Sequence, residues 1–223
     1  MKEDIEKDKQ YRENKEAELK QLKEVIENLQ PKPPQDFPNA IHNPDPADID
    51  FTDVDGRMKK ISKKLEKYNI VSLTQVMEDG IWDFETEFSC PNSVNASIGI
   101  VQDSYPIPIG VNPWNQPQIS HIAFFGGKGL SPNGGVWCKG TVITGNVEFK
   151  NNQKVKVEYD SEKGTLIFFI DGVQQPVYVT GINEKVRFFI HICHTGSSCT
   201  IRSLKKLTAA TSGHVANEKA IQW

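Results

Sequence analysis

The sequence lacks any long apolar run and any cluster of positive charge. Over 223 residues the formal net charge is -3 and hydrophobic residues make up 37%. No stretch approaches the roughly 20 apolar residues that a membrane helix needs. Lys and Arg are interleaved with Asp and Glu, whereas nucleic-acid binding requires a clustered basic excess. We therefore expect neither a membrane nor a nucleic acid as a partner.

Cysteine is scarce as well. Cys90, Cys138, Cys193 and Cys199 are too few and too scattered for a disulfide framework. The N-terminal residues are charged and contain no apolar segment of the kind that a secretion signal requires. These observations favour buried thiols in a cytoplasmic protein, and they do not exclude the nucleus.

The common catalytic and nucleotide-binding motifs are also absent. There is no Gly-x-Ser-x-Gly elbow, and the glycines within 126–135 do not form the Gly-Lys-Ser/Thr pattern of a phosphate-binding loop. His191, Cys193, His194 and Cys199 are residue types that bind zinc, but their spacing is poor and no Cys-x-x-Cys occurs. Buried thiols and a loop histidine are the favoured interpretation. We expect no cofactor, no metal and no enzyme activity.

The most informative segment that is present spans 154–179, KVKVEYDSEKGTLIFFIDGVQQPVYV. Over 154–159 apolar residues alternate with charged ones, which predicts a strand with one buried face. The run 165–170 is apolar on both sides and is predicted to be covered on both faces. The Asp-Gly pair at 171–172 supplies the positive φ angles of a two-residue hairpin turn, so the chain is predicted to return over 175–179.

Further strands are predicted on both sides of this segment. Alternation places Trp82, Phe84, Thr86 and Phe88 on one buried face of a strand that begins near Gly80. The other predicted strands cover 49–53, 58–62, 68–74, 97–101, 119–125, 185–191 and 199–204.

The order of these elements resembles that of a SPRY domain. The matching segments are the tryptophan-bearing strand 80–88, the short strand with a central glycine at 97–101, the segment 154–179, and the last two strands at 185–191 and 199–204. The resemblance covers Phe51 to Leu207, and the ordered set carries it. It implies an all-β fold, an antiparallel jelly-roll-like β-sandwich over residues 50–207. The composition of residues 1–30 predicts that this sandwich is preceded by one N-terminal helix.

Residues 1–30 contain no glycine or proline and are predicted to form a charged helix that ends before Pro31. Leu19, Leu22, Ile26 and Leu29 follow the spacing of a coiled-coil seam. A homodimer through residues 1–30 and a lone charged helix both remain open.

The two segments that flank the predicted sandwich are less regular. Six prolines in 31–49 favour an extended spacer over a proline-rich docking peptide. The tail 208–223 is compatible with a short helix, a strand or a frayed end, and the sequence does not decide among them.

Large aromatic residues in loops are frequent contacts of protein interfaces. Tyr105, Trp114 and Trp137 lie in or beside predicted loops, where each either contacts a partner or plugs an end of the sandwich. Asp103 adds a charge that would orient a partner. In SPRY domains the loop after the glycine strand and the loop before the last strand line the peptide-binding surface. The resemblance therefore implies a ligand-binding site that combines Asp103 and Tyr105 with Thr195 and Ser197.

These features predict a non-enzymatic module that binds a protein or a peptide. An alternative is a carbohydrate-binding or carbohydrate-active jelly roll that uses Asp83, Glu85 and Glu87, since residues two apart on a strand lie about 6.6 Å apart on one face. A second alternative is a structural scaffold whose helix is the active part, which burial of all three loop aromatics would favour.

The order of helix, linker and sandwich also resembles the C-terminal part of tripartite-motif proteins. The Cys and His pairs of their RING and B-box domains are absent from this sequence. We therefore assign no ligase activity.

Overall fold

The computed structural model describes residues 2–29, 33–56, 58–130 and 132–223. The chain divides into two compact units, Met1–Pro33 and Pro34–Trp223. Among the described residues, no helix is both long and apolar enough to cross a membrane.

The first unit is the single helix α1 (Lys2–Leu29), as predicted. Two ion pairs along its surface join Asp8 to Arg12 at 3.6 Å and Lys15 to Glu18 at 2.6 Å. Such pairs, three or four positions apart, stabilise an exposed helix only modestly. Of the predicted seam, the side chains of Leu19, Leu22 and Ile26 are exposed, while that of Leu29 lies outside the described residues.

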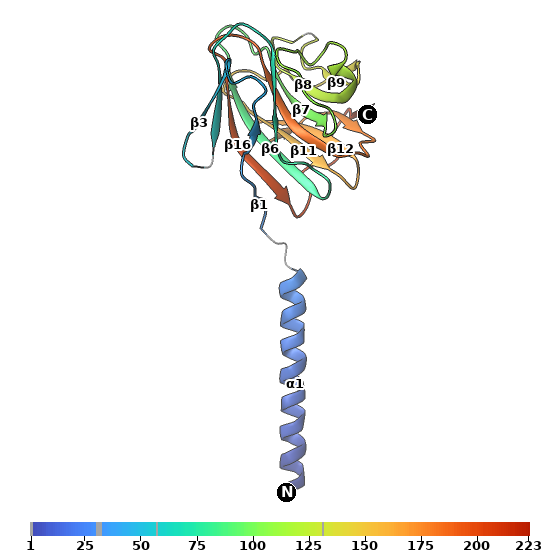
Figure 1. Ribbon diagram of the computed structural model, residues 1–223. Coiled ribbons are helices and arrows are strands. Elements are labelled where there is room, and N and C mark those ends of the chain that lie inside the picture. The colour runs from blue at the N-terminus through green and yellow to red at the C-terminus, as the bar shows by residue number, and fades with distance from the viewer. Residues whose placement is uncertain (1, 30–32, 57, 131) are drawn as a thin grey trace. The chain divides into compact units, whose positions relative to one another are not determined.

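The second unit is a β-sandwich of two sheets (Figure 1). The ten-stranded sheet has the order β17-β14-β12-β11-β6-β16-β4-β3, with β1 paired to β16 and β13 paired to β12. Its strands are β1 (Gln35–Asp36), β3 (Ile49–Asp53), β4 (Lys59–Lys63), β6 (Ile81–Ser89), β11 (Lys154–Asp160), β12 (Thr165–Ile170), β13 (Val173–Gln174), β14 (Val177–Thr180), β16 (Ser198–Leu207) and β17 (Lys219–Gln222).

The seven-stranded sheet has the order β10-β9-β8-β7-β15-β5-β2. Its strands are β2 (Ile41–His42), β5 (Asn69–Leu73), β7 (Ala96–Gln102), β8 (Ile122–Gly126), β9 (Val136–Cys138), β10 (Thr141–Ile143) and β15 (Val186–Ile192). A short 3-10 helix, η1 (Gln118–His121), precedes β8. Pairing between the described strands is antiparallel except between β14 and β17.

The main core lies between the two sheets. The predicted stripe on β6 points into it, since Trp82, Phe84, Thr86 and Phe88 are all buried. The rings of Phe84 and Phe188 stack across the sheets with centroids 5.2 Å apart. Such aromatic pairs add to the hydrophobic stabilisation that burial provides.

The central glycine of β7 has a steric cause. A Cβ atom at Gly99 would lie 2.0 Å from the carbonyl oxygen of Ala123 on the neighbouring strand β8. Backbone atoms cannot move aside as a flexible side chain can. Glycine is therefore required here for the close approach of two strands.

The segment predicted as a spacer, 31–49, differs from that prediction from Pro34 onward. There β1 pairs with β16 and β2 pairs with β5, so 34–49 belongs to the sandwich. Asp48 is fully buried and accepts hydrogen bonds from Lys63 and Asn69. A buried charge needs such partners, and these two hold the segment against the sheets.

The tail, which the sequence left undecided, contains the strand β17. Before β17, the amides of Thr211 and Ser212 donate to the buried carboxylate of Glu158 at 2.8 and 3.0 Å. The predicted strand 119–125 begins later than expected, because its first three residues lie in η1.

Candidate functional site on the seven-stranded sheet

The outer face of the seven-stranded sheet is apolar. Its buried side chains are Ile70, Val101, Ile122, Phe124 and Phe189 from the strands, together with Leu130. Residues 103–121, which we call the covering segment, cross this face between β7 and β8. The half-buried side chains packed against it are Tyr105, Ile107, Val111 and Trp114 of the covering segment and Trp137 of β9. The sandwich therefore has a third layer on this side.

Arg187 on β15 holds the start of the covering segment. Its Nη2 donates to the carbonyl oxygens of Asp103 at 3.3 Å and Tyr105 at 3.1 Å. Its Nη1 donates to the hydroxyl of Ser72 at 3.0 Å, and its Nε lies 3.0 Å from the carboxylate of Asp103. Hydrogen bonds from a charged donor are stronger than neutral ones, so this backbone is well fixed.

The two ends of the covering segment also meet each other. The rings of Tyr105 and His121 stack with centroids 4.2 Å apart. His121 Nδ1 forms a hydrogen bond with Gln102 Oε1, directly before the segment. These contacts close the covering segment at its base. The phenol of Tyr105 is partly buried there, and this burial raises its pKa.

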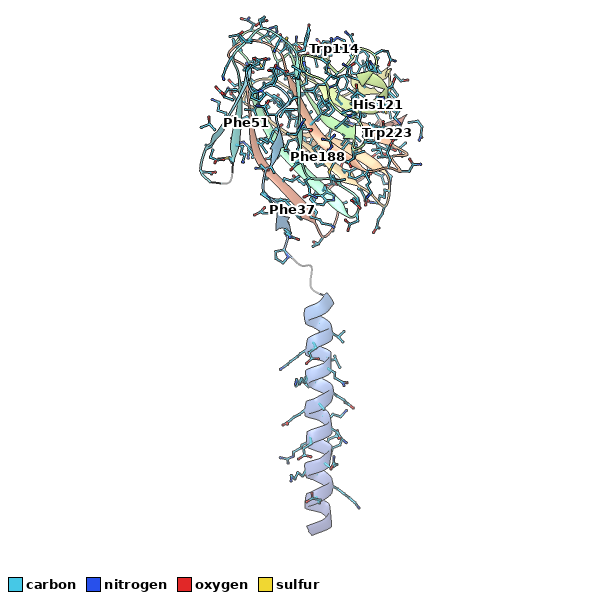
Figure 2. The ribbon with its side chains drawn as sticks, in the orientation of Figure 1. Phe37, Phe51, Trp114, His121, Phe188 and Trp223 are labelled. Carbon is cyan, nitrogen blue, oxygen red and sulfur yellow. The ribbon has the colours of Figure 1, made fainter. Side chains whose placement is uncertain are left out.

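Glu184 extends this network to Trp223, which is labelled with His121 and Trp114 in Figure 2. Gln102 donates to both of its carboxylate oxygens, at 2.8 and 2.9 Å, and Trp223 Nε1 also donates to it. Lys139 lies 3.4 Å from the same carboxylate and 4.3 Å from the Trp223 ring centroid. Burial would raise the pKa of Glu184, but these hydrogen bonds outweigh it and lower the pKa below 4.5.

Trp114 packs on two rings of the sheet. Its ring meets those of Tyr68 and His191 edge to face, each at a centroid distance of 5.3 Å. His191 is fully buried, and neither of its ring nitrogens has a hydrogen-bond partner among the described residues. Burial, with smaller contributions from the charges of Lys63 and His194, lowers the pKa of His191 to about 3. The imidazole is therefore neutral at pH 7 and acts as a packing group.

Trp137 stacks on Phe124 with centroids 5.9 Å apart and an angle of 8° between the rings. Tyr105, Trp114 and Trp137 are thus all half-buried. Tyr105 and Trp114 pack the covering segment against the sheet, and Trp137 of β9 packs on the same apolar face. None of the three projects into solvent. Neither of the two arrangements considered from the sequence, fully exposed contacts or fully buried plugs, describes them.

The residue that projects from the covering segment is Ile109, which is 60% exposed. Sequence reasoning missed it, and the repeat Pro-Ile-Pro-Ile at 106–109 carried no signal for it. Alternation with period two would place Ile107 and Ile109 on the same side, whereas in the structure Ile107 packs against the apolar face and Ile109 is exposed. Pro106 and Pro108 are exposed beside it.

Thr195 and Ser197 lie at the other end of the sheet from Asp103. Because β7 and β15 are antiparallel, Val186 is opposite Gln102, whereas Ile192 is opposite Ala96. Thr195 is exposed, but Ser197 is only 1% exposed, so its side chain does not reach the surface. The six predicted residues therefore do not form one continuous surface.

Asp83, Glu85 and Glu87 lie on the outer face of the ten-stranded sheet. Asp83 is 3.1 Å from the ammonium of Lys156, and Arg202 Nε donates to Glu87 at 2.9 Å. Burial raises the pKa of Asp83, and Lys156 opposes that shift. Two of the three acids are thus held in cross-strand ion pairs.

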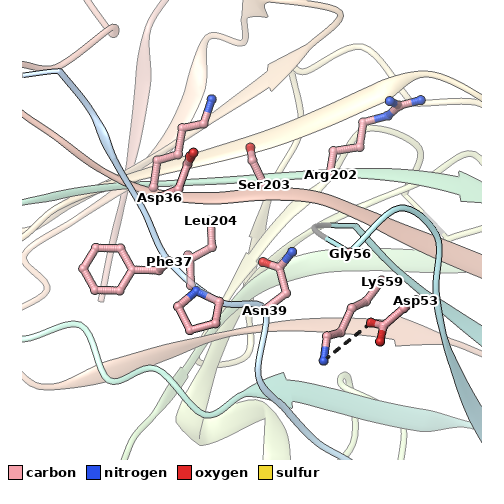
Figure 3. Close-up of a pocket in the computed structure, with 11 residues that line it drawn as sticks. Asp36, Phe37, Asn39, Asp53, Gly56, Lys59, Arg202, Ser203 and Leu204 are labelled. Carbon is pink, nitrogen blue, oxygen red and sulfur yellow. Dashed lines mark ion pairs between the residues drawn. The ribbon is translucent and has the colours of Figure 1, made fainter.

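A cavity of about 610 Å³ lies beside β16 (Figure 3), and Arg202, the partner of Glu87, is among the residues that line it. Its walls are the segment 36–39, the hairpin of β3 and β4, and residues 202–205. Phe37 and Leu204 supply apolar wall, while Lys59 and Asp53 form a 3.9 Å ion pair on the other side. A second cavity of about 280 Å³ lies next to Tyr159 and Glu184. None of the three strand acids lines either cavity.

Comparison with known proteins identifies the fold. No family model and no curated protein matches the sequence. The structure is similar to the PSpry domain of TRIM65, with a TM-score of 0.53 and 13% identity over 75% of this chain and 90% of that one. It is also similar to the SPRY domain of human HERC1, with a TM-score of 0.52 and 10% identity over 79% of this chain and 100% of that one. The predicted all-β, SPRY-like jelly-roll sandwich is confirmed.

Proposed function

We propose that this SPRY-like sandwich is a non-enzymatic module that binds a protein or peptide through the exposed surface of the covering segment. The observation that carries the proposal is the combination of a fixed backbone and an exposed apolar tip. Arg187 and the stacked pair Tyr105 and His121 hold the segment at its base, while Ile109 is 60% exposed.

A surface of this kind binds with little loss of conformational freedom. Loop ordering is a main cost of association, and here packing and hydrogen bonds have already ordered the loop. Pro106 and Pro108 restrict the backbone further on both sides of Ile107. The carboxylate of Asp103 is 35% exposed at the base and pairs with Arg187 at 3.0 Å, so it helps to fix the segment and still presents a polar group to a partner.

In this proposal the aromatic residues position the surface, and Ile109 makes contact. Substituting Tyr105 or Trp114 would move the whole segment and would not isolate one contact. Thr195 is exposed at the opposite end of the sheet and forms a separate surface. Ser197 has no contact role, because it is buried.

The charged face of the ten-stranded sheet supports a structural role more than a carbohydrate site. Two of its acids are neutralised by Lys156 and Arg202, and the amide of Thr211 donates to Glu158 on the same face. Cleavage of a glycosidic bond would instead need two acids that are free to act on the bond.

A defined probe tests the binding surface without knowledge of the natural partner. The full chain is used to select binders from a random-peptide phage library, and affinities are measured by fluorescence polarisation. We expect Ile109→Asp to weaken the selected peptides at least about tenfold, because a buried hydrophobic contact would be replaced by an unpaired charge. Val173→Asp is the matched control, since Val173 is 65% exposed and lies on β13 of the ten-stranded sheet. Unchanged affinity in Ile109→Asp, or failure to enrich any peptide, would count against the proposal.

We further propose that α1 pairs two chains. The side chains of Leu19, Leu22, Val25 and Ile26 are between 53% and 60% exposed, so they form an apolar stripe that a second copy of the helix would cover. Pairing would join two weak binding surfaces and raise their combined affinity through effective concentration.

Sedimentation equilibrium of the full chain tests the pairing. We expect a dimer that Leu22→Asp dissociates and that Lys20→Asp, on the same helix, leaves intact. A monomer at high protein concentration would disprove it.

A further inference from the structure

Three residues with different metal-binding groups converge beside β15. They are Glu66, Cys193 and His194, and a carboxylate oxygen, the sulfur and a ring nitrogen all lie within 4.8 Å of one another. Cys193 is buried, His194 is half-buried and Glu66 is exposed, so the cluster reaches from the interior to the surface. It is separate from the covering segment.

Strand pairing brings these residues together across 127 positions of sequence. Because β15 is antiparallel to β5 and Ile192 is opposite Asn69, the residues after Ile192 lie beside those before Asn69. This explains why the sequence did not connect Glu66 with Cys193 and His194. His191 and Cys199, which the sequence grouped with Cys193 and His194, lie elsewhere, in the aromatic packing of the outer face and in the main core respectively.

The backbone around the cluster is fixed. Gly196 donates to the carbonyl of Lys63 at 3.1 Å, and the amide of Lys63 donates to the carbonyl of Ser197 at 2.9 Å. On the other side, the amide of Leu65 donates to Asp48 at 2.7 Å. The three side chains are therefore presented from two loops that the sheet and a buried carboxylate hold in place.

Contacts within the cluster show that its side chains already face one another. His194 Nδ1 forms a hydrogen bond with one carboxylate oxygen of Glu66, and the amide of Thr195 donates to the other at 2.8 Å. In a tetrahedral zinc site, bonds of about 2.0 to 2.3 Å place neighbouring ligand atoms roughly 3.3 to 3.7 Å apart. A side-chain adjustment of about an ångström would reach that spacing.

We propose that Glu66, Cys193 and His194 form a site for a zinc-type divalent cation with three protein ligands. Thiolate, imidazole and carboxylate are the three ligand types that zinc takes in proteins, and the mixed set with a thiolate disfavours calcium and magnesium. On binding, the Cys193 thiol gives its proton to solvent and its sulfur bonds to the metal.

A fourth ligand to such a cation would come from the exposed side of the cluster. The Glu66 side chain is 63% exposed and that of His194 is 26% exposed. Water or a side chain of a bound protein can therefore complete the coordination. The metal would also tie the loop that bears Thr195 to the loop that bears Glu66, and so order the second exposed surface of the sandwich.

Zinc itself is the probe for the test. The full chain, kept reduced with a phosphine, is titrated with Zn²⁺ by calorimetry, and Co²⁺ is used to look for a thiolate-to-metal charge-transfer band in the near ultraviolet. We expect one equivalent of zinc per chain and a thiolate band. Cys193→Ser should abolish the band, and Cys193→Ser and His194→Ala should each weaken zinc binding at least about tenfold, since each removes a direct ligand.

Two further variants keep the result interpretable. Glu66→Gln changes an exposed side chain, so loss of zinc affinity with an unchanged near-ultraviolet circular dichroism spectrum cannot be attributed to unfolding. His214→Ala is the matched control, because His214 Nδ1 lies 3.2 Å from Glu218 in a similar pair. Among the described residues, no cysteine joins His214 and Glu218 in a group that could hold a metal ion. Absence of zinc binding, absence of the thiolate band, or equal affinity in all variants would overturn the proposal.

Discussion

The two outer faces of the sandwich are built from the same kind of strand but have opposite chemistry. On the seven-stranded sheet, Phe124 and Phe189 point outward and are buried under the covering segment. On the ten-stranded sheet, Asp83, Glu87 and Lys156 point outward and form ion pairs. An apolar outer face requires a third layer, whereas a charged outer face can meet water directly.

This difference determines where a loop can become a binding surface. The covering segment is held by burial of its inner side chains, so its outer side is free to carry residues such as Ile109. The segment 208–213 on the other face is held by hydrogen bonds to Glu158 and Gln174. The covering segment buries several large side chains, whereas the segment 208–213 is held by a few hydrogen bonds, so we expect the covering segment to be the more rigid of the two.

Removing the apolar support should have the largest effect. Phe189→Ala deletes a fully buried ring beneath the covering segment and is expected to lower the free energy of unfolding by about 3–5 kcal/mol. Glu85→Ala, on the charged face, should change it by no more than about 0.5 kcal/mol. Urea denaturation measures both, and equal effects would remove the distinction between the faces.

The next largest effect should come from Arg187. Arg187→Met keeps the aliphatic part of the side chain but leaves the carbonyls of Asp103 and Tyr105 without their donor. We expect a loss of about 2–3 kcal/mol, as for hydrogen bonds to charged groups. Lys185→Met removes an exposed ion pair with Glu78 and serves as the control. A loss as small as that of the control would show that Arg187 does not hold the segment.

Acid should weaken the apolar face through His191. Its pKa is lowered from 6.5 to about 3 by burial, so below pH 6.5 the unfolded chain binds a proton that the folded chain does not. The contribution of His191 to the free energy of unfolding falls by about 1.4 kcal/mol per pH unit as the pH decreases from 6.5 toward the pKa of His191 in the folded state. Between pH 7 and pH 5, the stability of the wild type relative to His191→Phe should therefore fall by about 2 kcal/mol. A difference that does not depend on pH would contradict this account of His191.

The smallest effect is expected on the charged face. Arg202→Met breaks a partly exposed ion pair with Glu87 and should cost about 0.5–1 kcal/mol, and less at high salt. Thermal melting at low and high salt measures this. A salt-independent loss of several kcal/mol would indicate that this face is not held together by screened surface charges.

Much of the fold could be predicted because local sequence patterns indicate where the strands and turns lie. The alternation on β6 and β11 and the Asp-Gly turn at 171–172 identify strands and their connections. The turn residues Asp171 and Gly172 do have positive φ angles, of 48° and 81°. The order of these strands along the chain carried the resemblance to SPRY domains, and that resemblance supplied the fold class.

The site could be predicted only in part, because its geometry depends on contacts between distant residues. Sequence pointed to Tyr105, Trp114 and Trp137 but not to the outer apolar face on which they lie. That face exists because Val101 of β7, Ile122 and Phe124 of β8, and Phe189 of β15 pack on the outer side of their sheet. The spacer prediction also failed from Pro34, since nothing local indicates that Asp48 is buried against Lys63.

The most direct test of the central claim is hydrogen exchange of the covering segment in the native protein. The amides of Asp103, Tyr105 and Ile119 donate to backbone carbonyls of Lys185, Gln102 and Asn115. If packing on the apolar face fixes the segment, these amides should exchange nearly as slowly as those of β7 in the wild type, and faster in Arg187→Met. Exchange in the wild type as fast as that of a freely exposed loop would contradict the account.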